Sequence, residues 1–123
     1  LNGDAVRDAV ANARRNQIGN IDFYEKDAGE FMVQLAEQQE RVDTVFMDPP
    51  RTGSDEVFLN SLVELAPRKI VYISCNPETL ARDLEYMGKR GYRAVKGVCV
   101  DMFPFCGHVE VIIMMQYCGK EKN

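Results

Sequence analysis

Apolar residues along this 123-residue chain follow two kinds of spacing. In one kind they recur three or four positions apart, as Leu80, Leu84 and Met87 do, which predicts a helix with one apolar face. In the other kind apolar residues follow one another directly, as within 69–74, which predicts a buried strand. The expected helices cover 4–16, 28–38, a segment starting at Ser54, and 77–89; the expected strands cover 21–25, 44–47, 69–74, 92–102 and 108–117.

Alternation of helices and strands indicates an α/β fold with a mostly parallel sheet, whose last strand returns antiparallel as one arm of a hairpin with its tip at 103–107. A doubly wound nucleotide-binding fold opens with a strand, a glycine-rich turn and a helix, and no G-x-G-x-x-G occurs here. We therefore expect a truncated Rossmann-like sheet that forms one domain over 1–118, followed by a short tail over 119–123.

Composition and charge narrow the setting in which the protein works. Hydrophobic residues make up 46% of the chain and charged residues 28%, as in an ordinary globular domain. The formal net charge of −4 offers no attraction for nucleic acid. The 4 cysteines form no C-x-x-C pair and there is 1 histidine, which argues against a zinc site or a disulfide framework. The same cysteine pattern suits a reducing cytoplasm, so we expect a cytoplasmic protein that binds no metal. No apolar run approaches the roughly 20 residues of a membrane span, so we expect no membrane partner.

Cys75 is the most conspicuous candidate for chemistry. It directly follows the strand 69–74 and precedes a helix that Asn76 can cap and Pro77 can open. The positive end of the helix dipole and the N–H groups at a helix start favour the thiolate form. Open α/β sheets also bind their ligands at the carboxyl ends of the strands. A buried cysteine that only fills space is the alternative interpretation.

Two carboxylates are expected near the same edge. Asp48 follows the strand 44–47 and is held by a rigid Pro-Pro backbone with Arg51 nearby. Glu110 lies within an apolar strand, where a carboxylate is costly unless it is paired or functional, so it is a candidate general base. The alternatives are a Pro-Pro pair that merely ends a strand beside a solvated Arg51, and an outward-facing Glu110. The lone His108 is interpreted as structural.

Three segments carry a resemblance to a known family. "DPPRTG" at 48–53, "SCNPETLARDL" at 74–84 and "DMFPFCGHVE" at 101–110 resemble, in order and spacing, the catalytic half of the RNA 5-methyluridine (uracil-5) methyltransferases. The opening segment is also similar to that family, so the likeness covers essentially the whole chain. It implies a class I methyltransferase sheet, S-adenosylmethionine as the cofactor, and tRNA or rRNA as the partner.

The resemblance also implies roles for individual residues. Cys75 would be the nucleophile that adds to C6 of uracil, and Glu110 the base that removes the C5 proton. Asp27 and Asp48 would contribute to the cofactor pocket, although Asp27 also has the spacing to Glu30 of a residue that caps its own helix.

Substrate contacts are expected from two loops. The target base must leave its stack to reach such a pocket, which makes Phe103 and Phe105 candidates for stacking or wedging, with Arg51 as a further contact. Plain packing in the hairpin is the alternative for the two phenylalanines.

Several parts of the family's proteins are not matched, namely the glycine-rich cofactor loop, the acidic ribose contact, and the RNA-binding and iron–sulfur modules that many relatives carry. An iron–sulfur cluster would therefore belong only to a preceding part. We expect the chain to be the C-terminal portion of a methyltransferase domain and to be inactive by itself. Two other interpretations stay open: an amino-group methyltransferase acting on nucleic acid or protein, which needs neither Cys75 nor Glu110, and a non-catalytic remnant of the fold.

The truncation has a consequence for the sheet. In the family's fold two further strands lie between 21–25 and 44–47, so the strand 44–47 becomes an apolar edge. The arrangement that we favour has 21–25 closing the gap and pairing with 44–47 through a right-handed crossover. The other arrangement is a dimer in which two chains join edge to edge.

Overall fold

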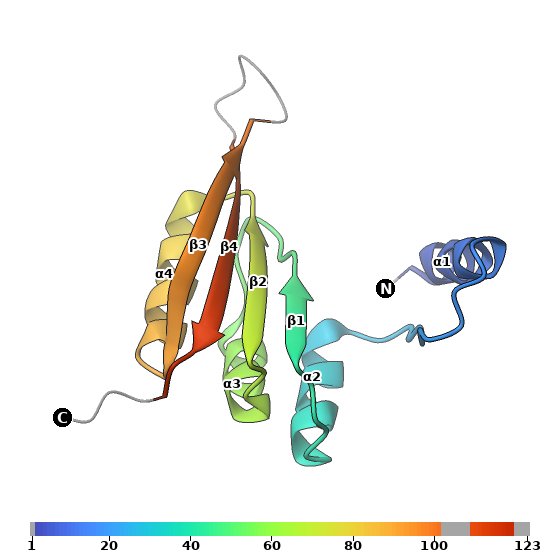
Figure 1. The fold of residues 1–123 in the computed structure, drawn as a ribbon, viewed down its shortest axis with the longest axis horizontal. Helices are drawn as coiled ribbons and strands as arrows, with labels where there is room; N and C mark the ends of the chain where they lie inside the picture. Colours follow the sequence, from blue (N-terminus) through green and yellow to red (C-terminus); the bar gives the residue numbers. More distant parts are fainter. Residues whose placement is uncertain (1, 102–108, 120–123) are drawn as a thin grey trace.

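The computed structural model describes residues 2–101 and 109–119, which fold around one four-stranded sheet (Figure 1). The helices are α1 (Gly3–Arg15), α2 (Ala28–Glu37), α3 (Glu56–Leu65) and α4 (Pro77–Gly88). The strands are β1 (Thr44–Met47), β2 (Lys69–Ser74), β3 (Tyr92–Val100) and β4 (Glu110–Tyr117). Each of these elements starts within two residues of its predicted position.

The strands lie in the order β1-β2-β4-β3. β1 and β2 pair in parallel, whereas β4 pairs antiparallel with both β2 and β3. Three strands therefore run in one direction and β4 alone runs against them, which confirms the predicted α/β sheet with its antiparallel last strand. The carboxyl ends of β1 and β2 and the start of β4 consequently meet at one edge of the sheet.

Local capping explains where the helices begin. Asp27 caps α2 through an Oδ1 atom that accepts the Glu30 N–H at 3.1 Å, as its spacing predicted. The helix expected to start at Ser54 begins two residues later, at Glu56, because the Asp55 side chain accepts the Phe58 N–H at 2.7 Å and thereby takes the capping position.

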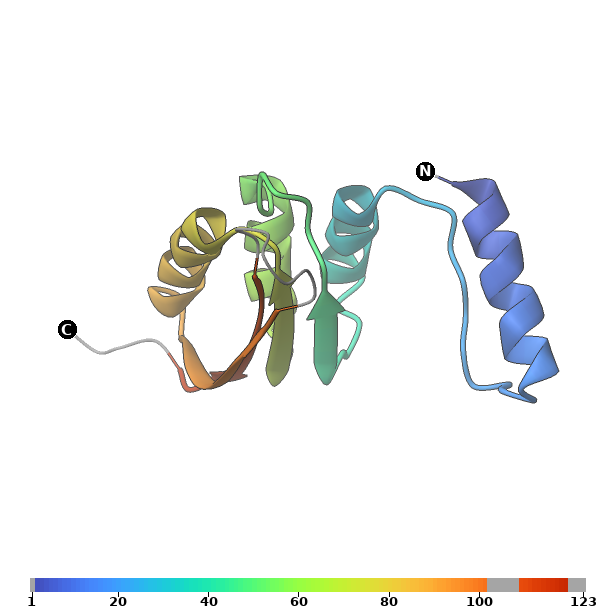
Figure 2. The ribbon, with the colours of Figure 1, turned by 90° about the horizontal axis from the view of Figure 1, so that it is seen from above.

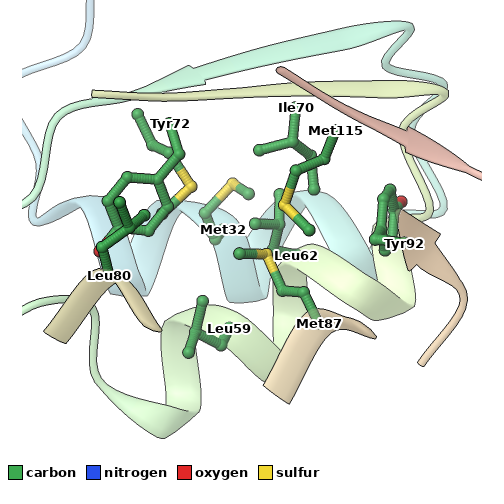
Figure 3. Packing of buried hydrophobic residues seen from close by; sticks show 10 residues of the cluster. Met32, Leu59, Leu62, Ile70, Tyr72, Leu80, Met87, Tyr92 and Met115 are labelled. Atoms are coloured by element: carbon green, nitrogen blue, oxygen red, sulfur yellow. The ribbon is translucent and has the colours of Figure 1, made fainter. Parts of the chain in front are cut away.

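The core lies between the sheet and a single layer of helices. α2, α3 and α4 all cover the same face of the sheet (Figure 2). Burial alternates along β2, so that Ile70, Tyr72 and Ser74 point toward the helices. Ile70 and Tyr72 pack there with residues of β4, α3 and α4, which include Met115, Leu62 and Met87 (Figure 3).

The strand predicted at 21–25 does not form, and the prediction that it pairs with β1 is wrong. The residues before α2 contact that helix instead: the ring of Tyr24 lies 4.8 Å from the ring of Phe31, and Lys26 Nζ donates to Gln34 Oε1 at 2.9 Å. A strand needs a neighbour for its backbone hydrogen bonds, and these contacts leave the segment away from β1. In the described chain the outer edge of β1 therefore pairs with no strand. The edge-to-edge dimer stays a prediction.

α1 stands apart from the sheet in both views (Figures 1 and 2). Asn2 caps this helix by accepting the N–H groups of Asp4 and Ala5, and none of its residues is buried. Its apolar side, which includes the half-buried Val6 and Val10, therefore contributes no fully buried residue to the core. Neither α1 nor another helix of the described residues is long and apolar enough to cross a membrane.

Candidate active site at the carboxyl edge of the sheet

Cys75 and Glu110 come from neighbouring antiparallel strands. Ser74, the last residue of β2, pairs with Val111 of β4. The ladder ends at that pair: Cys75 follows it in the bend after β2, and Glu110, the first residue of β4, precedes it. Cys75 and Glu110 are thus the chain neighbours of two residues whose Cα atoms an antiparallel pair holds about 5 Å apart. Both side chains are partly exposed, so a ligand at this edge has access to the two of them.

The backbone around Cys75 is held by its two neighbours. Ser74 Oγ accepts the Asn76 N–H at 3.0 Å and donates to the Asn76 carbonyl at 2.9 Å. Asn76 also caps α4, because its Oδ1 atom accepts the Glu78 N–H at 3.0 Å, and Pro77 occupies the first turn. The capping predicted from the sequence is confirmed. Cys75 is therefore placed immediately before the N-terminus of α4.

The loop after β1 is bonded to the same helix start. Gly53 N–H donates to the Pro50 carbonyl at 2.8 Å, which closes a tight turn. The Arg51 carbonyl accepts from Asn76 Nδ2 and from Thr79 Oγ1, each at 3.0 Å. The segment that follows Asp48 is thus tied directly to the residues that follow Cys75.

Asp27 and Asp48 line one groove of about 570 Å³ between α2, α3 and the end of β1. Aromatic and aliphatic side chains form much of its remaining wall, among them Phe31, Phe46, Met47 and Phe58. Flat apolar surface beside two carboxylates suits an adenosine, whose ring needs burial and whose hydroxyls need acceptors. The residues present therefore fit the cofactor that the resemblance implies. Neither Cys75 nor Glu110 lines this groove.

The predicted site residues thus lie at one end of the sheet, Cys75 and Glu110 beside the last β2–β4 pair and Asp27 and Asp48 in the wall of one groove. Asp27 is also engaged as the cap of α2, which was the alternative interpretation of that residue. Arg51 is exposed on the loop after β1, and its carbonyl accepts the hydrogen bonds that tie this loop to the start of α4. Phe103 and Phe105 lie outside the described residues, as does His108.

One functional feature escaped the sequence analysis, namely a buried carboxylate behind the loop. Asp83 on α4 has no exposed surface and accepts hydrogen bonds from Tyr72 and from the Ser54 N–H. A signal was available, since Asp83 lies three residues after Leu80 and four before Met87, on the apolar face of the helix. A charged residue at such a position is rarely buried without partners.

Gly53 makes the close approach of loop and helix feasible, and we expect Gly53→Ala to lower the free energy of unfolding by about 2 kcal/mol. Its φ of +75° is unfavourable for other residues, and an added Cβ would lie 2.5 Å from Arg82 Nη2 and 2.9 Å from Asp83 Oδ2. Urea denaturation of the chain measures the change. Gly88→Ala is the matched control, because Gly88 is helical and has nothing within 4 Å. Equal midpoints for the two variants would contradict the expectation.

Comparison with known proteins identifies the family. The family model described as "tRNA (Uracil-5-)-methyltransferase" matches residues 2–117. The chain belongs to this family. It is 42% identical over 120 residues to an "uncharacterized RNA methyltransferase" of Clostridium tetani, covering 98% of this chain and 26% of that protein. It is 44% identical over 111 residues to the "23S rRNA (uracil(1939)-C(5))-methyltransferase RlmD" of Aeromonas hydrophila, covering 90% of this chain and 25% of that protein.

A solved relative supports the fold as well. The tRNA (uracil-54, C5)-methyltransferase of Pyrococcus abyssi, determined in complex with S-adenosyl-L-homocysteine, superposes with a TM-score of 0.70 at 34% identity. The match covers 93% of this chain and 26% of that protein. The predicted methyltransferase fold is thereby confirmed. The chain spans about a quarter of the length of the curated relatives described above.

Proposed function

We propose that this chain is the catalytic portion of an S-adenosylmethionine-dependent RNA methyltransferase that methylates uridine at C5 in tRNA or rRNA. Family membership and the activities named for the Aeromonas and Pyrococcus relatives support the proposal. The observation that carries it is the last β2–β4 pair, Ser74 with Val111, which adjoins Cys75 and Glu110 at the end of the sheet where the groove lined by Asp27 and Asp48 also lies.

The two residues perform complementary steps. Cys75 thiolate forms a bond to C6 of the uracil ring, and the electron pair of the C5–C6 double bond makes C5 nucleophilic. The cofactor, which Asp27 and Asp48 would help to hold, supplies an electrophilic methyl group for C5 when bound. Glu110 then accepts the C5 proton, the C5–C6 double bond re-forms, and the Cys75 sulfur leaves with its electron pair. The cycle needs both residues within reach of one base.

The competing interpretation is methylation of an amino group. Such an enzyme acts on a nitrogen that already carries a lone pair, so it needs neither a nucleophile for C6 nor a base for a carbon-bound proton. A cysteine and a carboxylate beside the same strand pair have no purpose in that chemistry, and their placement favours the uracil-5 reaction. The inactivity of the isolated chain stays a prediction.

Removal of the gene that encodes this sequence should abolish 5-methyluridine at one position of tRNA or rRNA. Mass spectrometry of nucleosides from separated tRNA and rRNA fractions measures the loss and tells the two substrates apart. Restoring the wild-type gene should restore the modified nucleoside. Loss of an N-methylated nucleoside with 5-methyluridine unchanged would instead establish the amino-group reaction, and unchanged RNA together with inactive purified protein would indicate a non-catalytic remnant.

A further inference from the structure

The carboxylate of Asp83 is buried and fully occupied by donors. Its Oδ2 atom accepts from the Tyr72 hydroxyl at 2.6 Å and from the Ser54 N–H at 2.9 Å. Its Oδ1 atom accepts from the neighbouring Arg82 side chain, at 3.1 Å from Nε and 3.0 Å from Nη2. One side chain on α4 is therefore bonded both to β2, through Tyr72, and to the loop after β1, through Ser54.

Arg82 extends this contact along the loop. Its Nη2 atom donates to the carbonyl of Thr52 at 2.9 Å and to the carbonyl of Ser54 at 3.2 Å, while the same guanidinium is paired with Asp83. Arg82 and Asp83, which are consecutive residues of α4, thus form hydrogen bonds with the backbone of 52–54. Gly53 between these two carbonyls is buried and leaves no room for a side chain.

Tyr72 is the third residue of this hydrogen-bonded group, after Asp83 and Arg82, and it links the group to the strand that leads to Cys75. Tyr72 precedes Cys75 by three residues on β2 and lies in the core between sheet and helices (Figure 3). Burial and the adjacent Asp83 carboxylate raise the pKa of the Tyr72 hydroxyl well above its usual range. A tyrosine hydroxyl is protonated at neutral pH in any case, and the raised pKa keeps this one a donor to Asp83 at alkaline pH as well.

Stability alone does not call for this arrangement. Taking a carboxylate out of water is costly even when it is paired, and apolar replacements of buried charged groups are often neutral or stabilising. The Asp83 position lies between Leu80 and Met87 on the core face of α4, where an apolar residue would pack with less cost. An apolar residue, however, could not accept hydrogen bonds from both the Ser54 N–H and the Tyr72 hydroxyl.

We propose that Asp83, with Arg82 and Tyr72, is a positioning group that fixes the loop 48–54, and with it the Asp48 side of the cofactor groove, relative to Cys75. This inference rests on the proposed methyltransferase function. In that reaction the methyl group and the thiolate must reach adjacent carbons of one ring, so the cofactor groove and Cys75 must keep a fixed separation. A misplacement of about 1 Å between reacting groups costs on the order of 10²-fold in rate.

A pair of buried tyrosines offers a matched test in the full-length enzyme. Tyr72→Phe removes the 2.6 Å bond to Asp83, and Tyr92→Phe removes an equally short bond from Tyr92 to the Pro67 carbonyl. The two rings lie at opposite ends of the core (Figure 3). We expect Tyr72→Phe to raise KM for S-adenosylmethionine and to lower kcat/KM by roughly 10- to 100-fold. Tyr92→Phe should leave both constants nearly unchanged at a comparable loss of thermal stability.

Asp83→Asn supplies a second, independent variant. It keeps the size of the side chain but replaces one acceptor oxygen with an NH₂ group. That group cannot accept hydrogen bonds from the donors that surround Asp83. Hydrogen exchange of the Ser54 amide should accelerate in this variant and in Tyr72→Phe, but not in Tyr92→Phe. This readout does not depend on activity. If Asp83→Asn proves too unstable for kinetics, exchange in Tyr72→Phe, which retains the ring, still tests whether these hydrogen bonds hold the loop.

The outcomes separate the two proposals. A wild-type enzyme that does not methylate uracil C5 would overturn the proposed function, whereas the exchange data would still report on the loop. A wild-type enzyme that is active, with equal kinetic constants for Tyr72→Phe and Tyr92→Phe, would overturn the positioning role. A fall in kcat with KM unchanged, matched by an equal fall in the fraction of folded enzyme, would also overturn it, because that is the effect of stability alone.

Discussion

Cys75→Ala should lower methyl transfer by the full-length enzyme by roughly 10⁴-fold or more, because the covalent route to a nucleophilic C5 is lost with the thiolate. Binding of S-adenosylmethionine should remain nearly unchanged, since the groove with Asp27 and Asp48 does not include Cys75. Transfer of a labelled methyl group to RNA measures the first quantity, and calorimetry measures the second. The expected pattern is a loss of chemistry without a loss of cofactor binding.

Cys118→Ala is the matched control for this substitution. Cys118 is an exposed cysteine after β4, at the opposite edge of the sheet from Cys75. Its replacement should leave turnover as it is in the wild-type enzyme. Substantial turnover in Cys75→Ala would exclude the covalent mechanism and favour the amino-group reaction, for which no nucleophilic sulfur is needed.

Glu110→Gln should arrest the reaction after methylation rather than before it. Glutamine keeps the shape of the side chain but cannot accept the C5 proton, so addition of Cys75 and transfer of the methyl group proceed while release of the sulfur stalls. The variant should accumulate a protein–RNA adduct that survives denaturation and carries the added methyl group. Gel electrophoresis under denaturing conditions and mass spectrometry of the adduct measure it.

The double variant Cys75→Ala, Glu110→Gln is the decisive control, because an adduct that depends on the Cys75 sulfur cannot form in it. An adduct in the double variant would mean that another residue is the nucleophile. Free protein only, in a Glu110→Gln enzyme that still binds RNA and cofactor, would show that Glu110 is not the base that removes the C5 proton.

Features that depend on neighbours in the sequence were predictable from the sequence. The caps Asp27 and Asn76 and the helix-opening Pro77 act within a few residues, and the structure has them as predicted. The strands 44–47 and 69–74 were also predicted correctly, because an apolar run long enough for a strand is a local property. Motif order and spacing further indicated the family, which the comparisons confirm.

The segment 21–25 illustrates where local pattern fails. Its apolar residues suit a strand, but a strand also requires a partner for its backbone groups, and Tyr24 and Lys26 contact α2 instead. Whether such a run pairs is decided by which edges the rest of the chain brings near it.

The sequence by itself determined the helices, the paired strands and the residue types available for chemistry at their ends. The tertiary structure alone decided which of those residues meet. The last β2–β4 pair, Ser74 with Val111, which sets Cys75 and Glu110 near each other, joins positions 37 residues apart, and the bond from the Ser54 N–H to Asp83 joins positions 29 apart. Contacts of this kind leave little trace in a linear pattern, because strand register and helix docking depend on how the whole core packs.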